Sequence, residues 1–139
     1  MRRLLFLDFD GVLHPATCAS EEHLCRVDIL ADALSGKACD LIISSSWRHH
    51  HNYATLIGMF PDPLRERFVG TTGHPRFGRW PRHQEIVAFA SQFSGQMEWR
   101  ALDDSRNEFP PNCPELIACD PNIGMASRQV IALQAWLRH

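Results

Sequence analysis

Short, continuous runs of apolar residues alternate along this chain with segments of helical periodicity, and this alternation limits the fold more than any other feature. The apolar runs span Leu4–Phe9, Leu41–Ile43, Trp99–Leu102 and Leu116–Cys119, and a further brief strand is expected near Phe68–Gly70. Continuous apolar runs are typical of parallel strands that are covered on both faces. We therefore predict a doubly wound, Rossmann-like α/β fold, in which helices flank a parallel sheet.

Helical periodicity fills the segments between these runs. Helices are predicted over Glu21–Ser35, Arg82–Phe93 and Ser127–Leu137. Gly36 is a typical C-terminal stop, Pro81 suits a first helical position, and Ser127 is the predicted N-cap of the last helix. The stretch from His49 to Gly78 is interrupted by proline and glycine, so only one or two short helices are expected there. No repeat or linker divides the chain, and we predict a single domain over residues 1–139.

Size and cysteine content limit the classes of protein to which the chain can belong. A chain of 139 residues buries roughly two-thirds of its unfolded surface, which is enough for a hydrophobic core. The first apolar run is interrupted by Asp8 and is too short for a signal peptide or a membrane span. The five cysteines contain no C-x2-C pair, so neither a disulfide framework nor a zinc site is predicted. We expect reduced thiols, a cytoplasmic protein and no membrane contact.

Charge is distributed unevenly along the chain. The net charge of −2 gives no general attraction to nucleic acid. Six arginines lie from Trp47 to Arg82, whereas six acidic residues lie from Glu98 to Asp120. The first stretch could hold an anion and the second a cation, or both could be ordinary solvated loops.

Polar side chains follow three of the predicted strands at the point where each strand ends. They are Asp8 and Asp10, the serines from Ser44 to Ser46, and the pair Asp103 and Asp104. Ligands of open α/β sheets bind beyond the carboxyl ends of the strands. We therefore expect these three groups to converge at one edge of the sheet.

The acidic residues of this group predict a metal site. Asp8 and Asp10 are two residues apart, and side chains at that spacing on a strand point to the same face. Two neighbouring carboxylates repel each other unless a cation lies between them, and an all-oxygen ligand set favours Mg²⁺. We predict Mg²⁺ as the cofactor, with ligands drawn from Asp8, Asp10, Asp103 and Asp104.

The residues beside these acids suit a phosphorylated ligand. Gly11 lets the backbone turn away closely beneath a ligand. A serine hydroxyl from the second strand can donate a hydrogen bond to a phosphoryl oxygen. Acids, magnesium and hydroxyl donors together indicate a phosphoryl-transfer site.

Three stretches resemble motifs of the haloacid dehalogenase (HAD) superfamily. "LLFLDFDGVL" resembles its first motif, "LIISSSW" its second and "RALDDS" its fourth. The resemblance implies that Asp8 is the nucleophile that becomes phosphorylated and that Asp10 is the general acid and base. It also implies that Ser45 binds the phosphoryl group, with Ser44 as the alternative.

The same resemblance assigns the remaining acids and a cation. The acids of the fourth motif fall on Asp103 and Asp104, of which Asp104 is favoured as the direct magnesium ligand. The third motif of the superfamily usually supplies a lysine, but the only lysine, Lys37, precedes the second motif. Arg82 is the predicted substitute and Arg79 the alternative, because a guanidinium group binds phosphoryl oxygens through its planar fork. The further candidates for substrate binding are Ser44, Gly11, Arg48 and Arg79.

A narrower resemblance covers nearly the whole chain. "FLDFDGVLHP", "IISSSWR", "RHQEI", "ALDDS" and "CDPNIGMA" are together similar to the HAD domain of Swiss Army Knife RNA repair proteins. Only about 30 residues separate Asp10 from Leu41, and one helix takes up most of them, so no substantial cap is expected there. An open site resembles superfamily members that act on large substrates such as nucleic-acid ends or phosphoproteins, and small phosphate esters also remain candidates.

These features together predict a Mg²⁺-dependent phosphatase that acts on a phosphomonoester, such as a nucleic-acid end, through an aspartyl-phosphate. One alternative is a module that recognises a phosphate or nucleic-acid end without hydrolysis, since "RFGRWPR" places Trp80 among arginines. A receiver-type phosphoacceptor domain is a weaker alternative, because such domains carry a lysine after the acids and no lysine follows Lys37. No pattern in the chain indicates an oligomeric state.

Overall fold

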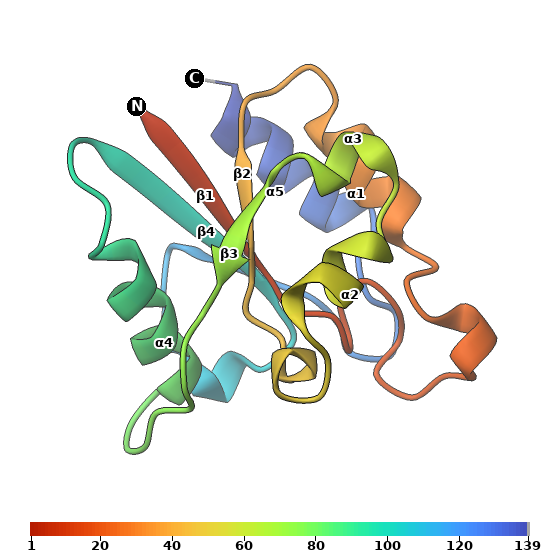
Figure 1. Ribbon diagram of the computed structural model, residues 1–139, viewed down its shortest axis with the longest axis horizontal. Helices are drawn as coiled ribbons and strands as arrows, with labels where there is room; N and C mark the ends of the chain where they lie inside the picture. The colour runs from red at the N-terminus through yellow and green to blue at the C-terminus, as the bar shows by residue number, and fades with distance from the viewer. Residues whose placement is uncertain (139) are drawn as a thin grey trace.

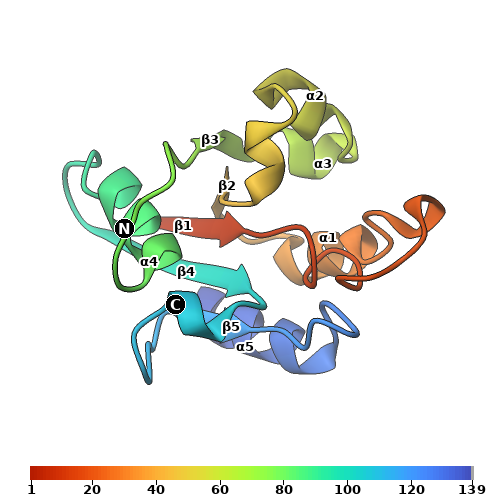
Figure 2. The ribbon, with the colours of Figure 1, turned by 90° about the horizontal axis from the view of Figure 1, so that it is seen from below.

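The computed structural model describes residues 1–138, which contain a five-stranded parallel sheet with the strand order β3-β2-β1-β4-β5 (Figure 1). The strands are β1 (Arg2–Leu7), β2 (Asp40–Ile43), β3 (Phe68–Thr71), β4 (Met97–Asp103) and β5 (Leu116–Ala118). Leu7 lies beside both Ile43 and Leu102 in the register, so the carboxyl ends of the three central strands are level. Figure 2 shows β1 and β4 pointing the same way.

Helices cover both faces of the sheet, with α4 on one side and α1 and α5 on the other (Figure 1). The α-helices are α1 (Val27–Leu34), α2 (Tyr53–Gly58), α3 (Asp62–Arg65), α4 (Pro81–Ala90) and α5 (Ser127–Leu137). Short 3₁₀ helices occur at η1 (Ser20–Glu22), η2 (Ser46–His49) and η3 (Arg106–Glu108). The doubly wound α/β fold predicted from the sequence is confirmed.

The side chains of the central strands alternate between two hydrophobic clusters. Leu5 and Leu7 of β1 pack with residues of α1 and α5 in the larger cluster. Leu4 and Phe6 pack with Ile86 of α4 in the smaller one. Residues of even number in β1 therefore face α4, and this parity continues to the residue that follows the strand.

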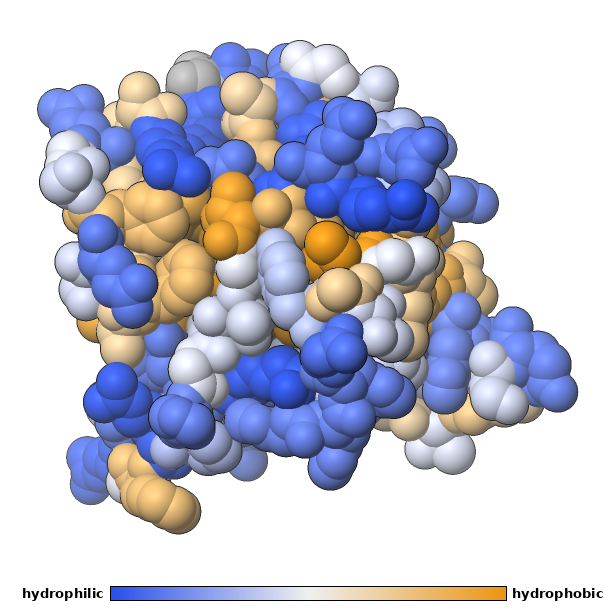
Figure 3. All heavy atoms as spheres, in the orientation of Figure 1, coloured by the Kyte–Doolittle hydropathy of each residue, from blue (hydrophilic) through white to orange (hydrophobic). Residues whose placement is uncertain are grey.

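The segment between β2 and β3 belongs to the core and does not form a separate cap. Leu56, Phe60 and Leu64 from this segment are almost fully buried and join the larger hydrophobic cluster. Figure 3 shows that apolar surface on this face gathers in a band across the middle, between polar rims. The chain thus has a HAD-like α/β fold without a cap.

Among residues 1–138, the helices are too short or too polar to cross a bilayer.

The structure corrects one predicted helix start and one predicted N-cap. The helix expected over Glu21–Ser35 is reduced to α1, because Leu24 has a φ of 63° and its N–H is bonded to His14 Nδ1 at 3.1 Å. A left-handed residue cannot continue an α-helix. The helix predicted over Ser127–Leu137 has those bounds, but its N-cap is Ala126, whose N–H donates to Gln129 Oε1 at 2.9 Å.

Candidate active site

Three carboxylates meet beyond the carboxyl ends of β1 and β4. Ligand oxygens of Asp8, Asp103 and Asp104 lie within 4.8 Å of one another, and we call this group the acid cluster. Asp8 follows β1 directly, and its N–H continues the pairing with β4 by donating to Leu102 O at 3.1 Å. Asp8 and Asp103 are buried, whereas Asp104 is half-buried. Acids from two of the three groups expected at this edge of the sheet, those that end β1 and β4, therefore meet.

Arg82 brings a buried positive charge to the acid cluster. Its Nη1 donates to Asp103 Oδ2 at 2.8 Å and lies 3.6 Å from Asp8 Oδ1. Arg82 is the second residue of α4, the helix on the face toward which the parity of β1 directs Asp8. Pro81 occupies the first helical position, and Trp80 before it has a left-handed φ of 56°. This turn sets the start of α4 at the acid cluster.

Burial and repulsion from neighbouring carboxylates raise the pKa values of Asp8 and Asp103. Desolvation raises the pKa of Asp8 well above its usual value and the charge of Asp103 raises it further, while Arg82 acts in the opposite direction. Desolvation raises the pKa of Asp103 to about 6, again opposed by Arg82. One guanidinium group therefore leaves part of the repulsion uncompensated, and a divalent cation would offset the remainder.

The residues present fit Mg²⁺. Carboxylate oxygens from two strand ends are the ligands that this ion prefers. Gly11 has a φ of 76° and lies so close to Asp104 that a β-carbon at this position would overlap the carboxylate. Gly11 thus keeps space beside Asp104 that any other residue would fill. Asp8 and Asp104 are the best placed ligands, because Asp103 already accepts hydrogen bonds from Arg82 and, at 2.9 Å, from Ser105 N.

Asp10 lies outside the acid cluster, so the prediction that its carboxylate binds the metal does not fit this geometry. β1 ends at Leu7, and a turn follows in which Leu13 N donates to Phe9 O at 2.9 Å. The strand periodicity used to place Asp10 beside Asp8 is therefore lost. The carboxylate of Asp10 is instead held by two other side chains.

His14 and Trp47 hold the two oxygens of Asp10. His14 Nε2 lies 2.7 Å from Asp10 Oδ1, and Trp47 Nε1 donates to Asp10 Oδ2 at 3.0 Å. Since His14 Nδ1 accepts the N–H of Leu24, its proton is on Nε2 and is donated to Asp10. The side chain of Asp10 is 47% exposed, so it keeps access to solvent while its orientation is fixed.

Sequence reasoning did not identify His14 or Trp47 as part of the site. The contact of Trp47 with Asp10 spans 37 positions of the chain, so no local pattern in the sequence indicates it. His14 forms a second possible metal group with Cys18 and His23, whose ligand atoms lie within 4.8 Å of one another. Both nitrogens of His14 are already hydrogen-bonded, however, so this group carries no metal assignment.

The structure distinguishes the two candidate serines. Ser44 N donates to Leu7 O at 2.9 Å, which places Ser44 beside Asp8, and its hydroxyl is buried without a hydrogen-bond partner among residues 1–138. Ser45 Oγ instead accepts the N–H of Trp47 at 3.2 Å and caps η2. An unpaired buried hydroxyl is costly unless a ligand satisfies it. The geometry therefore favours Ser44, the alternative, over Ser45 as the hydroxyl that meets a ligand.

Arg48 is not available for substrate, contrary to the prediction. Its Nη2 donates to Glu85 Oε1 at 2.8 Å, and the exposed fractions of the two side chains are 6% and 7%. The other nitrogens of Arg48 donate to carbonyl oxygens of Ser44, Ser45 and Gly73. Arg48 thus ties the ends of β2 and β3 to α4.

Arg79 also lies apart from the acid cluster. Its side chain is exposed, and its guanidinium carbon lies 6.0 Å from the centre of the Trp80 ring. No ion pair joins it to a carboxylate in the described part of the chain. Of the two arginines considered for the third motif, the one beside Asp8 is Arg82.

A protein-family model matches most of the chain. The model of a family described as "HAD domain in Swiss Army Knife RNA repair proteins" matches residues 4–130. This range contains all of the residues described above as the site. No curated protein and no solved structure gives a significant match.

Proposed function

Because the chain belongs to the family of HAD domains found in Swiss Army Knife RNA repair proteins, we propose that it is a Mg²⁺-dependent phosphatase that acts through an aspartyl-phosphate on Asp8. The observation that carries the proposal is the acid cluster with Arg82 at its side. HAD domains are generally hydrolases of phosphate esters, and this site holds the groups that such chemistry needs. The proposal includes a phosphomonoester substrate, such as a nucleic-acid end, and a cytoplasmic location.

Phosphoryl transfer begins on Asp8. Its carboxylate attacks the phosphorus, an Asp8 oxygen–phosphorus bond forms, and the bond between phosphorus and the leaving oxygen breaks. Asp10 donates a proton to the leaving oxygen as general acid. The hydrogen bonds from His14 and Trp47 orient Asp10 for this transfer.

Hydrolysis of the aspartyl-phosphate uses the same residues. Asp10, now deprotonated, accepts a proton from a water molecule that attacks phosphorus, which releases phosphate and regenerates Asp8. Ser44 donates its hydroxyl hydrogen to a phosphoryl oxygen, and the charge of Arg82 stabilises the equatorial oxygens. Mg²⁺ bound by Asp8 and Asp104 would supply further positive charge to these oxygens.

The proposal is tested by hydrolysis of a simple aryl phosphate. Wild type is compared with Asp8→Asn, with Mg²⁺ and with a chelator, and Asp28→Asn is the control because Asp28 is an exposed acid on α1. We expect turnover that requires Mg²⁺, is lost in Asp8→Asn and is kept in Asp28→Asn. Equal turnover by Asp8→Asn and wild type would refute the proposal.

A second candidate function is recognition of a phosphate end without hydrolysis. The loop between β3 and α4 favours it, because Phe77 there is 90% exposed and lies between Arg76 and Arg79 in the sequence. Exposed aromatic and arginine side chains suit single-stranded nucleic acid. Binding of a phosphorylated oligonucleotide together with the absence of any turnover would support this candidate over the phosphatase.

A further inference from the structure

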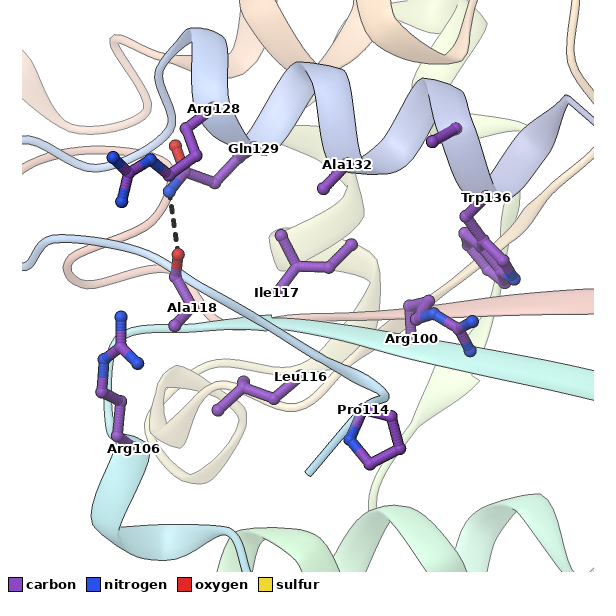
Figure 4. A pocket seen from close by; sticks show the side chains of 11 residues that line it. Arg100, Arg106, Pro114, Leu116, Ile117, Ala118, Arg128, Gln129, Ala132 and Trp136 are labelled. Atoms are coloured by element: carbon purple, nitrogen blue, oxygen red, sulfur yellow. Dashed lines mark hydrogen bonds between the residues drawn. The ribbon is translucent and has the colours of Figure 1, made fainter. Parts of the chain in front are cut away.

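A groove separate from the acid cluster runs between β5 and α5. One cavity of about 550 Å³ is lined by residues of both elements. A second cavity of about 470 Å³ adjoins it and shares Arg106, Ala118, Arg128 and Gln129 with it. Figure 4 shows α5 on one side of the first cavity and the segment with Leu116–Ala118 on the other. We call the two cavities together the β5 groove.

Three arginines line the β5 groove, and none is paired with an acid. Arg106 and Arg128 lie at one end and Arg100 lies at the other, beside Trp136 (Figure 4). Within residues 1–138, no ion pair to a carboxylate involves any of the three. Asp120 also lines the second cavity, where its Oδ1 accepts the N–H of Asn122 at 2.9 Å, and its carboxylate is the one acidic side chain that residues 1–138 contribute to the lining of the two cavities. With three arginines and one acid in its lining, the groove carries an excess of positive charge on a chain whose net charge is −2.

The floor of the groove between these arginines is apolar. Leu116 and Ile117 come from β5, and Ala132 and Trp136 come from α5. The guanidinium group of Arg100 lies 5.3 Å from the centre of the Trp136 ring, which fixes one end of the groove. Charges at both ends of an apolar floor suit a ligand with repeated negative charge and flat apolar faces between the charges.

The β5 groove ends next to the acid cluster. Cys119 lines the second cavity, and its N–H donates to Asp103 O at 3.0 Å. Arg106 follows Asp103 by three residues and begins η3. A chain molecule held in the groove therefore has a short path to Asp8.

We propose that the β5 groove binds the backbone of single-stranded nucleic acid, with phosphates on Arg100, Arg106 and Arg128 and bases against the apolar floor. Single strands are bound by positive grooves that offer aromatic side chains to the bases, and Trp136 lines this groove. A small anion could contact Arg106 and Arg128 at one end of the groove, but only a longer ligand also reaches Arg100 at the other end. The delivery of the strand end to Asp8 rests on the proposed phosphatase function, but binding in the groove does not.

The proposal is tested with single-stranded oligonucleotides that carry a fluorescent label and lack terminal phosphates. Binding is followed by fluorescence anisotropy at several salt concentrations, with DNA and RNA of the same sequence. The variant is Arg106→Gln with Arg128→Gln, because Arg100 also packs on Trp136. The control is Arg65→Gln on α3, which precedes the opposite edge strand and whose side chain is 44% exposed.

The salt dependence gives the expected magnitude. Each phosphate contact with a single strand contributes about 0.7 to the slope of log affinity against log salt, so the double variant should lose about 1.4 from that slope. The control should keep the wild-type slope. The arm that binds more tightly, RNA or DNA, identifies the preferred strand.

Three results would overturn the proposal. These are no binding of either oligonucleotide at low salt, an unchanged slope in the double variant, and binding of an oligoglutamate peptide that is as tight as that of the oligonucleotides. Because the probes lack a terminal phosphate, none of these results depends on hydrolysis. If the protein hydrolyses the aryl phosphate but binds no oligonucleotide, only the proposal for the groove is refuted. If it binds oligonucleotides with the expected salt dependence but hydrolyses no aryl phosphate, only the proposed phosphatase function is refuted.

Discussion

The contact between Trp47 and Asp10 gives the sharpest prediction, because it can be removed with little change in shape. Trp47→Phe deletes the indole N–H that donates to Asp10 Oδ2 at 3.0 Å. In wild type the ring of Trp47 packs on Phe9, with 5.2 Å between the two ring centroids, and the variant keeps an aromatic ring at this position. The variant thus removes one of two side-chain donors to Asp10 and leaves His14 in place.

The magnitude follows from the role of Asp10. General acid catalysis contributes about 10²- to 10⁴-fold, and a hydrogen bond to a charged group contributes about 1.5–3 kcal/mol. Because the side chain of Asp10 is 47% exposed, we take the lower end of this range. We expect kcat/KM for an alkyl phosphate to fall about 10-fold, which corresponds to about 1.4 kcal/mol.

The assay compares two leaving groups. A nitrophenyl phosphate has a leaving group that needs no proton, so Trp47→Phe should change its kcat/KM much less than that of the alkyl phosphate. The control is Trp99→Phe, since Trp99 packs on Phe6 in the cluster on the α4 face. Equal losses for both substrates, or no loss for either, would refute the positioning of Asp10 by Trp47.

The remaining predictions concern the metal, the buried ion pair and the thiols. Mg²⁺ should raise the thermal unfolding temperature of wild type but not of Asp104→Asn, because ligand binding stabilises only a protein that has the site; an equal shift in both proteins would exclude Asp104 as a ligand. Arg48→Gln should lower the free energy of unfolding in urea by about 3 kcal/mol, since buried Glu85 then keeps only its longer ion pair with Arg82 at 3.8 Å. A loss below about 1 kcal/mol would contradict this. Burial raises the pKa of Cys39 to about 12, so mass spectrometry should find this thiol alkylated well after the exposed Cys25.

The sequence was sufficient to predict the sheet and the place where its acids meet. Continuous apolar runs identify buried parallel strands, and the strand ends of such a sheet share one edge. Asp8 and Asp103 follow directly from this rule, because each lies at the end of its strand. Their placement needs only the pattern of the chain.

Details that depend on one residue of register could not be predicted. Ser44 and Ser45 are adjacent, and a shift of one position moves a side chain to the other face of a strand. The helix expected over Glu21–Ser35 begins only at Val27, and the N–H of Leu24 before it donates to His14 Nδ1 instead of to a helix carbonyl. Neither feature leaves a periodic signal in the sequence.

Contacts between distant segments were also beyond the sequence pattern. Arg100, Arg106 and Arg128 come from β4, η3 and α5, and only the folded chain places them along one groove. Arg48 illustrates the opposite case, because all three nitrogens of this candidate for substrate binding donate to acceptors within the protein. Residue type alone does not distinguish an arginine that meets a ligand from one that supports the fold.

The most direct test of the central claim is chemical trapping of the aspartyl-phosphate. Asp10→Asn is mixed with Mg²⁺ and a radiolabelled nitrophenyl phosphate, whose leaving group needs no acid, and the reaction is quenched in acid. Because Asp10 is also the base for hydrolysis, we predict that label accumulates on the peptide that contains Asp8 and is absent from the Asp8→Asn protein. Release of nitrophenol with no label on Asp8, or with label on another residue, would contradict the account.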